Sequence, residues 1–157
     1  MTLLNAAPYD VRKETRNRYL LIGGLVAIAL AVVLGVGGFF MGHGWFFSNL
    51  PAEHRVSVFL STLKHQDYDR AYGIWFNDPK WKQHPEVHKT YPIKRFTEDW
   101  TTASDYGPVT SYHVDISRRT GTGVIVALHL NGNPKPMFLW YERSNGTLSY
   151  SPLELEY

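Results

Sequence analysis

The sequence has no cysteine among its 157 residues. This absence excludes disulfide bonds, cysteine-ligated zinc, iron–sulfur clusters and thiol catalysis, since each of them needs a cysteine sulfur. Charged residues are also few, at 19% of the chain, whereas aromatic residues reach 15%. The chain does have a long apolar run near its N-terminus. It also has enough large side chains to fill one core.

Positive charge is in excess only before the apolar run. That stretch has four Lys or Arg and two acidic residues, whereas the rest of the chain has twelve of each sign. A nucleic-acid-binding protein needs a clustered excess of Lys and Arg to neutralise phosphates. The composition therefore argues against a nucleic-acid partner.

The apolar run extends from Tyr19 to Phe40, 22 residues without a charged side chain. As a helix rising about 1.5 Å per residue it would reach roughly 33 Å, enough to cross a hydrocarbon layer of ~30 Å. Four basic residues lie between Arg12 and Arg18, and the next basic residue is Arg55. The positive-inside rule then predicts a cytoplasmic N-terminus and a periplasmic or extracellular C-terminal part. A cleaved signal peptide is the alternative, but its apolar region would be only about 7–15 residues long.

These boundaries divide the chain into four parts. Residues 1–18 are predicted as a basic cytoplasmic tail, 19–41 as a single-pass helix of the inner or plasma membrane, 42–50 as a juxtamembrane linker and 51–157 as an extracytoplasmic domain. The linker combines glycines with aromatic residues that include Trp45 and Phe46. We therefore expect it to lie along the membrane interface and not to act as a flexible spacer.

Small residues recur at every fourth position of the predicted membrane helix. They are Gly23, Ala27, Ala31 and Gly35. Such a stripe lets the backbone of a second helix approach closely, which favours an integral membrane partner. The alternative is that membrane helices are rich in Gly and Ala in any case.

Hydrophobic periodicity predicts an α+β fold for the domain. Helical spacing indicates a hairpin of helices at about 51–65 and from Tyr68 to Trp75, capped by Asp67, a loop at 77–91 and a third helix from about Pro92 to Ser104. Two-residue alternation then predicts strands at 109–117, 123–131, 136–143 and 147–151, separated by turn residues. Helices followed by a four-stranded antiparallel meander indicate an α+β domain with its sheet curved over the first helix.

The run from Phe59 to Tyr72, FLSTLKHQDYDRAY, carries a resemblance to a known fold. Together with the third helix, the break at Tyr106 and Gly107 and the strand meander, it resembles the cystatin-like, nuclear transport factor 2-like superfamily over about residues 51–152. Members of that superfamily have a "gDY..AY" turn in a helical hairpin, and Gln66 stands here where they often have Gly. The resemblance implies a curved sheet that folds into a cone. The superfamily includes steroid isomerases, ligand binders and membrane-anchored accessory domains, so the resemblance leaves the function open.

A cone-shaped domain offers a pocket, and three strand residues could supply its polar groups. These are His113, Asp115 and His129, the first two on one face of the same strand. An isomerase would need a carboxylate or imidazole of perturbed pKa in such a pocket. The alternative is that all three side chains face solvent on a half-exposed sheet.

The cluster His84-Pro85-Glu86-Val87-His88 has two imidazoles four residues apart, which could bind a divalent metal. Its spacing differs from that of the zinc-protease motif, which has Glu directly after the first His. Pro85 also argues against a preformed helix. We interpret the cluster as a solvated loop, and we predict neither a metal nor a cofactor.

Aromatic residues exceed the need of one small core, so some are expected on a binding surface. The candidates are Phe138 and Trp140 on one strand face, with Trp45 and Phe46 beside the membrane. The sequence thus predicts a non-catalytic accessory or assembly subunit of a larger membrane complex, whose partners are the lipid bilayer and integral membrane proteins. A carrier of a small apolar ligand, or an isomerase-like enzyme using the cone pocket, is the alternative.

Overall fold

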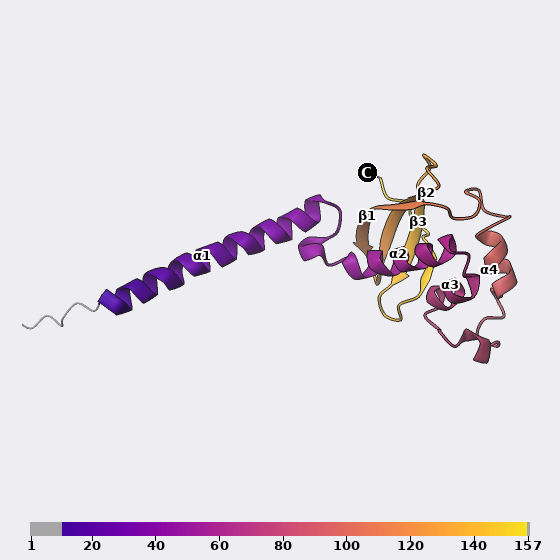
Figure 1. Ribbon diagram of the computed structural model, residues 1–157, viewed down its shortest axis with the longest axis horizontal. Coiled ribbons are helices and arrows are strands. Elements are labelled where there is room, and N and C mark those ends of the chain that lie inside the picture. The colour runs from indigo at the N-terminus through magenta and orange to yellow at the C-terminus, as the bar shows by residue number, and fades with distance from the viewer. Residues whose placement is uncertain (1–10, 157) are drawn as a thin grey trace, which may run out of the picture.

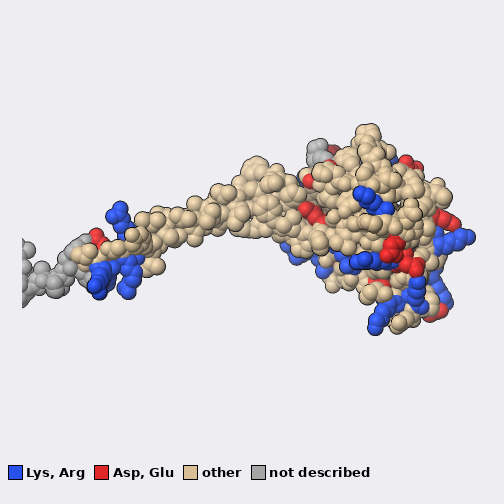
Figure 2. Space-filling model, viewed as in Figure 1, with Lys and Arg blue, Asp and Glu red and all other residues tan. Residues whose placement is uncertain are grey.

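The computed structural model, which describes residues 11–156, begins with the long helix α1 (Val11–Phe40). The helix starts eight residues before the apolar run, so residues 11–18 of the predicted tail are helical, and residues 1–10 lie outside the described part. It projects away from the rest of the molecule (Figure 1). Lys and Arg side chains lie at its start, followed by an uncharged stretch up to the domain (Figure 2). By length and composition α1 can cross a membrane, which is compatible with a single-pass anchor.

Three further α-helices follow: α2 (Leu50–Lys64), α3 (Tyr68–Trp75) and α4 (Ile93–Asp99). The prediction of a hairpin is confirmed for α2 and α3, and the Asp67 carboxylate accepts a hydrogen bond from Arg70 N at 3.1 Å, which caps α3. Helix α4 ends five residues before the predicted end. The amides of Thr101 and Ala103 both donate to Glu98 O, so the chain turns there and does not continue the helical ladder.

The sheet contains β1 (Tyr112–Thr120), β2 (Gly123–Leu130), β3 (Met137–Glu142) and β4 (Leu148–Tyr150). The strands are antiparallel and lie in sequence order, which confirms the predicted meander. Strand β1 extends to Thr120 because the turn to β2 needs only Gly121 and Thr122; Gly121 has φ 53°, which suits glycine. A register shift between Val114 and Ile116 places a bulge at Asp115.

The main core lies between the sheet and the helices that cover one of its faces (Figure 1). Strand β2 contributes alternate residues, as its pattern predicts: Val124, Val126, Leu128 and Leu130. On the helical side, the ring of Phe59 lies 5.3 Å from that of Trp75 and 5.1 Å from that of Trp100, centroid to centroid. These buried aromatic side chains fill the space between the sheet and the helices.

The opposite face of the sheet carries a second, smaller core. Its buried members are Ile125, Ala127 and Leu155, and Ile116, Phe138 and Trp140 pack against them. The C-terminal segment thus covers part of this face by inserting Leu155. Trp140 lies over Gly123, where an added Cβ would come within 2.3 Å of the indole. The glycine therefore makes room for a large ring on this face.

Candidate functional site

The segment from Met41 to Asn49, here called the juxtamembrane hook, turns back onto the end of α1. It contains a short 3-10 helix, η2 (Trp45–Phe47). His43 N donates to Gly38 O at 2.9 Å, and a Cβ added to Gly38 would lie only 2.6 Å from Gly44 O. The hook can approach α1 this closely because the helix has glycine at the contact.

The ring of Phe46 lies directly on Gly35 of α1. A Cβ at Gly35 would come within 2.9 Å of that ring. Phe46 and Phe47 adopt left-handed backbone conformations, with φ of 51° and 55°. Such conformations are costly for bulky residues and persist only where surrounding contacts hold them.

A buried polar network fixes the hook to the domain. In β1, Ser117 donates its backbone N–H to Gly42 O at 2.7 Å and its hydroxyl to Oε1 of Glu53 in α2. His43 Nδ1 lies 2.9 Å from the same carboxylate oxygen. Asn49, only 2% exposed, donates Nδ2 to Ser117 O at 3.2 Å. Since the buried polar groups satisfy one another, the hook is a fixed joint between helix and domain.

The predicted stripe on α1 is divided by this hook. Gly35 is buried under Phe46, whereas Gly23, Ala27 and Ala31 are exposed. Phe40 at the end of α1 and Trp45 in the hook are also exposed, at 81% and 56%. The open part of the stripe therefore lies within the apolar stretch of α1.

The four predicted partner-surface residues occupy two separate places. Trp45 and Phe46 are exposed on the hook, at 56% and 62%. Phe138 and Trp140 are half-buried on the outer face of the sheet, beside Leu155. The first pair lies where a membrane interface would meet α1, and the second pair lies on the domain itself.

The three predicted pocket residues do come together, on the outer face of the sheet and not among the main core. His129 Nδ1 lies 2.7 Å from Asp115 Oδ2, and His113 Nε2 lies 3.8 Å from Asp115 Oδ1. The bulge in β1 gives Asp115 this position between the two imidazoles. The three side chains form a polar group on the outer face, in which the His113 side chain is 79% exposed and that of Asp115 is 17% exposed.

The two imidazoles of the 84–88 cluster converge on one carboxylate. His84 Nδ1 and His88 Nε2 lie 2.8 Å and 3.1 Å from Asp78 Oδ2. The hydrogen bond from His84 is the main reason that the pKa of Asp78 is lowered, and the bond from His88 adds to it. Among the described residues no group of three His, Asp or Glu is arranged to hold a metal ion. Buried against the rings of Tyr72 and Phe76, His88 instead ties the loop to the core.

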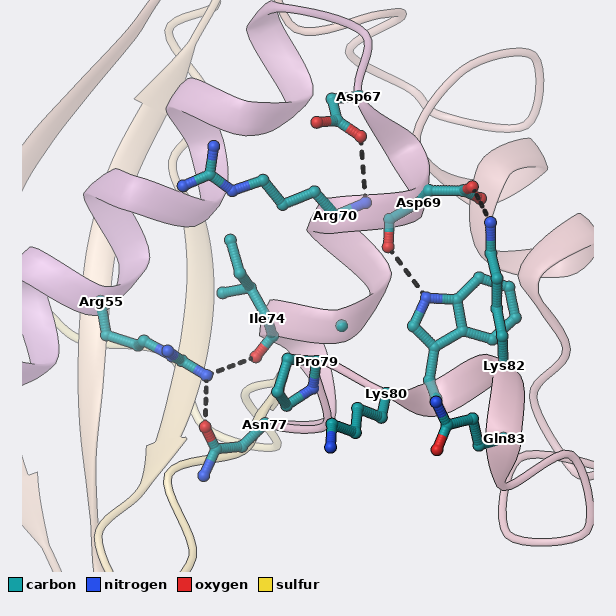
Figure 3. Close-up of a pocket in the computed structure, with 12 residues that line it drawn as sticks. Arg55, Asp67, Asp69, Arg70, Ile74, Asn77, Pro79, Lys80, Lys82 and Gln83 are labelled. Carbon is teal, nitrogen blue, oxygen red and sulfur yellow. Dashed lines mark hydrogen bonds and ion pairs between the residues drawn. The ribbon is translucent and has the colours of Figure 1, made fainter.

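A groove that the sequence does not reveal lies between α2, α3 and the 3-10 turn η3 (Trp81–Gln83). Its volume is about 590 Å³, and four basic side chains line it: Arg55, Arg70, Lys80 and Lys82 (Figure 3). Arg55 Nη2 donates to Ile74 O at 3.1 Å and to Asn77 Oδ1 at 2.7 Å. Only the folding of α2 against α3 brings Arg55 to residues 67–83, so no local motif could have indicated the groove.

Together these features define an α+β domain fixed to a helix that is long and apolar enough to cross a membrane. Comparison of the chain with protein families, with curated proteins and with solved structures gives no match. The relation to the cystatin-like superfamily therefore stays a prediction.

Proposed function

We propose that this protein is a non-catalytic accessory or assembly subunit of a larger membrane protein complex. In this proposal α1 packs against an integral membrane partner, and the domain, a membrane-anchored member of the cystatin-like superfamily, binds the partner outside the cytoplasm. The observation that carries the proposal is the juxtamembrane hook. A freely diffusing enzyme or carrier has no need of a fixed joint. A subunit that contacts one partner both within the membrane, through α1, and outside it, through the domain, does need one.

The joint limits the positions that the domain can take above the membrane. Glu53 and Ser117 hold the hook on the domain side, and Gly38 accommodates it on the helix side. A partner that contacts both α1 and the domain then loses less conformational entropy on binding, because their relative placement is already set. Preorganisation of this kind supports an assembly role.

The orientation in the proposal follows from the charges that flank α1. Arg12, Lys13, Arg16 and Arg18 precede the apolar stretch, and the hook that follows it has no Lys or Arg. The N-terminus is then cytoplasmic, and the domain is periplasmic or extracellular. The exposed rings of Trp45 and Phe46 suit the headgroup layer on that side.

The alternative, a ligand carrier or isomerase, needs a cavity under the sheet. Phe59, Trp75 and Trp100 pack against one another in that space and are each at most 4% exposed. The polar groups His113 and Asp115 belong to the other face. No specific observation therefore favours this second function.

Co-purification in mild detergent, followed by mass spectrometry, tests the proposal. The wild-type chain should bring down one or more integral membrane proteins in stoichiometric amount. Ala27→Leu with Ala31→Leu should reduce that recovery at least about fivefold, because the added side chains fill the approach path of a second helix. Ala29→Leu with Val33→Leu, on the opposite side of α1, is the matched control and should keep the partner. Purification of the wild-type chain alone would contradict the proposal.

A further inference from the structure

The groove between α2, α3 and η3 presents positive charge that the carboxylates of residues 11–156 compensate only in part. Among residues 11–156, Arg55, Arg70 and Lys80 form no ion pair with a carboxylate, whereas Lys82 pairs with Asp69. We propose that this groove binds an extended acidic segment of a partner protein. The proposal goes beyond the assembly role above, because it assigns a second binding site and the chemistry of its ligand.

The spacing of the cationic groups selects an extended ligand. In Figure 3 the guanidinium of Arg70, the guanidinium of Arg55 and the ammonium of Lys80 point to different parts of the groove, with Ile74 and Pro79 between them. An extended ligand can follow such an arrangement along the groove. Side chains on the same side of an extended peptide repeat at roughly 6–7 Å, so successive acidic residues could reach successive cations.

Two of the groove's walls are held in place before any ligand arrives. Arg55 is fixed by Ile74 O and Asn77 Oδ1, and its buried Nε has no acceptor among the described residues. On the other side, Trp81 donates its indole N–H to Asp69 O at 3.1 Å. Because these side chains are already ordered, a ligand would lose less binding free energy to their immobilisation.

The positive character is local to the groove and does not reflect a basic domain. The chain beyond α1 has as many acidic as basic residues. Among the groove's lining residues, four cations face two carboxylates, those of Asp67 and Asp69. Asp67 is engaged as the cap of α3, and Asp69 neutralises Lys82. The remaining charge therefore favours an anionic partner over a cationic one.

The position of the groove identifies the partner as protein and not as the surrounding lipid. Helix α3 and the η3 turn lie at the end of the domain away from α1 (Figure 1). Lys and Arg side chains lie at that end together with Asp and Glu (Figure 2). The headgroups of the membrane that α1 crosses would lie at the hook, at the other end of the domain from α3 and η3. An acidic polypeptide is therefore better placed than the surrounding lipid to occupy the groove.

The test uses the full chain in detergent and a fluorescent octaglutamate peptide that carries a photo-crosslinker. Crosslinks should map to residues 55–83, and Arg70→Gln with Lys80→Gln should weaken binding about tenfold, the loss expected for two charge contacts. Neither side chain makes a hydrogen bond within the described residues, so the variant should fold, with an unchanged melting midpoint. Lys80→Gln alone, expected to weaken binding about threefold, keeps the test valid if the double variant does not fold.

Lys94→Gln with Lys135→Gln is the matched control, since it removes the same charge from exposed sites outside the groove. It should change affinity less than about twofold. An equal loss in this control, crosslinks confined to residues 11–18, or displacement of the peptide by inorganic phosphate at constant ionic strength would each overturn the proposal. The test does not involve the stripe on α1, so its failure would leave the co-purification result standing.

Discussion

At the scale of single residues, Glu53 links three parts of the chain. Its carboxylate, on a residue only 8% exposed, accepts a hydrogen bond from the Ser117 hydroxyl and lies 2.9 Å from His43 Nδ1. A buried carboxylate with two polar partners is expensive to remove, because the partners are then left without an acceptor. Glu53 therefore has a structural task that its exposed neighbour His54 does not share.

Replacing Glu53 by Ala should lower the free energy of unfolding by about 2–3 kcal/mol, because the buried hydroxyl of Ser117 and the half-buried imidazole of His43 lose their partner. Urea denaturation of the full chain in detergent, followed by tryptophan fluorescence, measures the change. Glu86→Ala removes a surface pair with Lys89 and should cost less than about 0.5 kcal/mol. Equal effects of the two substitutions would contradict the role assigned to Glu53.

Two tyrosines of raised pKa, Tyr91 and Tyr150, allow a prediction of how stability depends on pH. Burial is the main cause that raises the pKa of Tyr91, and its hydrogen bond to Asp99 Oδ2, at 2.7 Å, adds to the shift. Burial also raises the pKa of Tyr150 to about 12. Both hydroxyls thus keep their protons in the folded chain at a pH where an unfolded tyrosine, with a pKa near 10, loses its own. The stabilisation of the folded chain by these two tyrosines is therefore complete below pH ~10 and is lost as the pH rises above that value.

Tyr91→Phe should reduce the steepness of this alkaline loss, and it should lower stability at pH 7 by about 1–2 kcal/mol through loss of the bond to Asp99. Melting midpoints of the full chain between pH 7 and pH 11 measure both effects. Tyr68→Phe is the control, because the Tyr68 hydroxyl forms no hydrogen bond within residues 11–156. An unchanged alkaline slope in the Tyr91 variant would refute the argument.

At the scale of elements, the sequence correctly predicts those helices and strands whose position depends only on neighbouring residues. Alternation in β2 places Val126 and Leu128 in the main core and Ile125 on the other face, as the structure confirms. The Asp67 cap of α3 is equally local. The end of α4 does not follow from a local pattern, because it depends on the amides of Thr101 and Ala103, which both donate to Glu98 O. Local patterns thus suffice for most elements and fail where the chain leaves its regular ladder.

The candidate site is less predictable, because its contacts join distant parts of the chain. Asn49 forms a hydrogen bond with Ser117, 68 residues further along the chain, and Arg55 forms one with Asn77, 22 residues further along. No periodicity encodes such pairs. The sequence did indicate that Trp45 and Phe46 lie beside the membrane segment, but not that Phe46 would cover Gly35.

The glycines of α1 provide a matched pair for testing the hook. Gly38→Leu should displace it, because a Cβ there would come within 2.6 Å of Gly44 O and 2.7 Å of Phe47 N. Gly37→Leu should leave it in place, since nothing lies within 4 Å of that position. The chain has no cysteine, so spin labels on Leu25→Cys and Val87→Cys can report the distance between helix and domain. A broadened distance distribution is expected for Gly38→Leu only, and identical distributions would show that the hook does not set the joint.

At the scale of the whole molecule, the charges and the geometry agree with the proposed arrangement across a membrane. The Lys and Arg residues of α1 lie at its start, and the domain lies at its other end (Figure 2). The hook brings Trp45 and Phe46 back beside the helix end, where a headgroup layer would receive them. Helix α3, which forms one side of the groove, lies at the end of the domain away from α1 (Figure 1). In the proposed assembly, α1 and the domain would offer a partner two separate surfaces whose relative position the hook sets.

The orientation itself is testable because every introduced cysteine is unique. Val87, 72% exposed, lies in the domain, and Thr15 lies in the basic first part of α1. In right-side-out vesicles a membrane-impermeant maleimide should label Val87→Cys and not Thr15→Cys, and in inside-out vesicles the pattern should reverse. Replacing Arg12, Lys13, Arg16 and Arg18 by Gln should weaken this preference, since the retained positive charges set the orientation. Labelling of Thr15→Cys from outside in the wild-type background would place the domain in the cytoplasm, and the proposed partner would then have to be sought on that side.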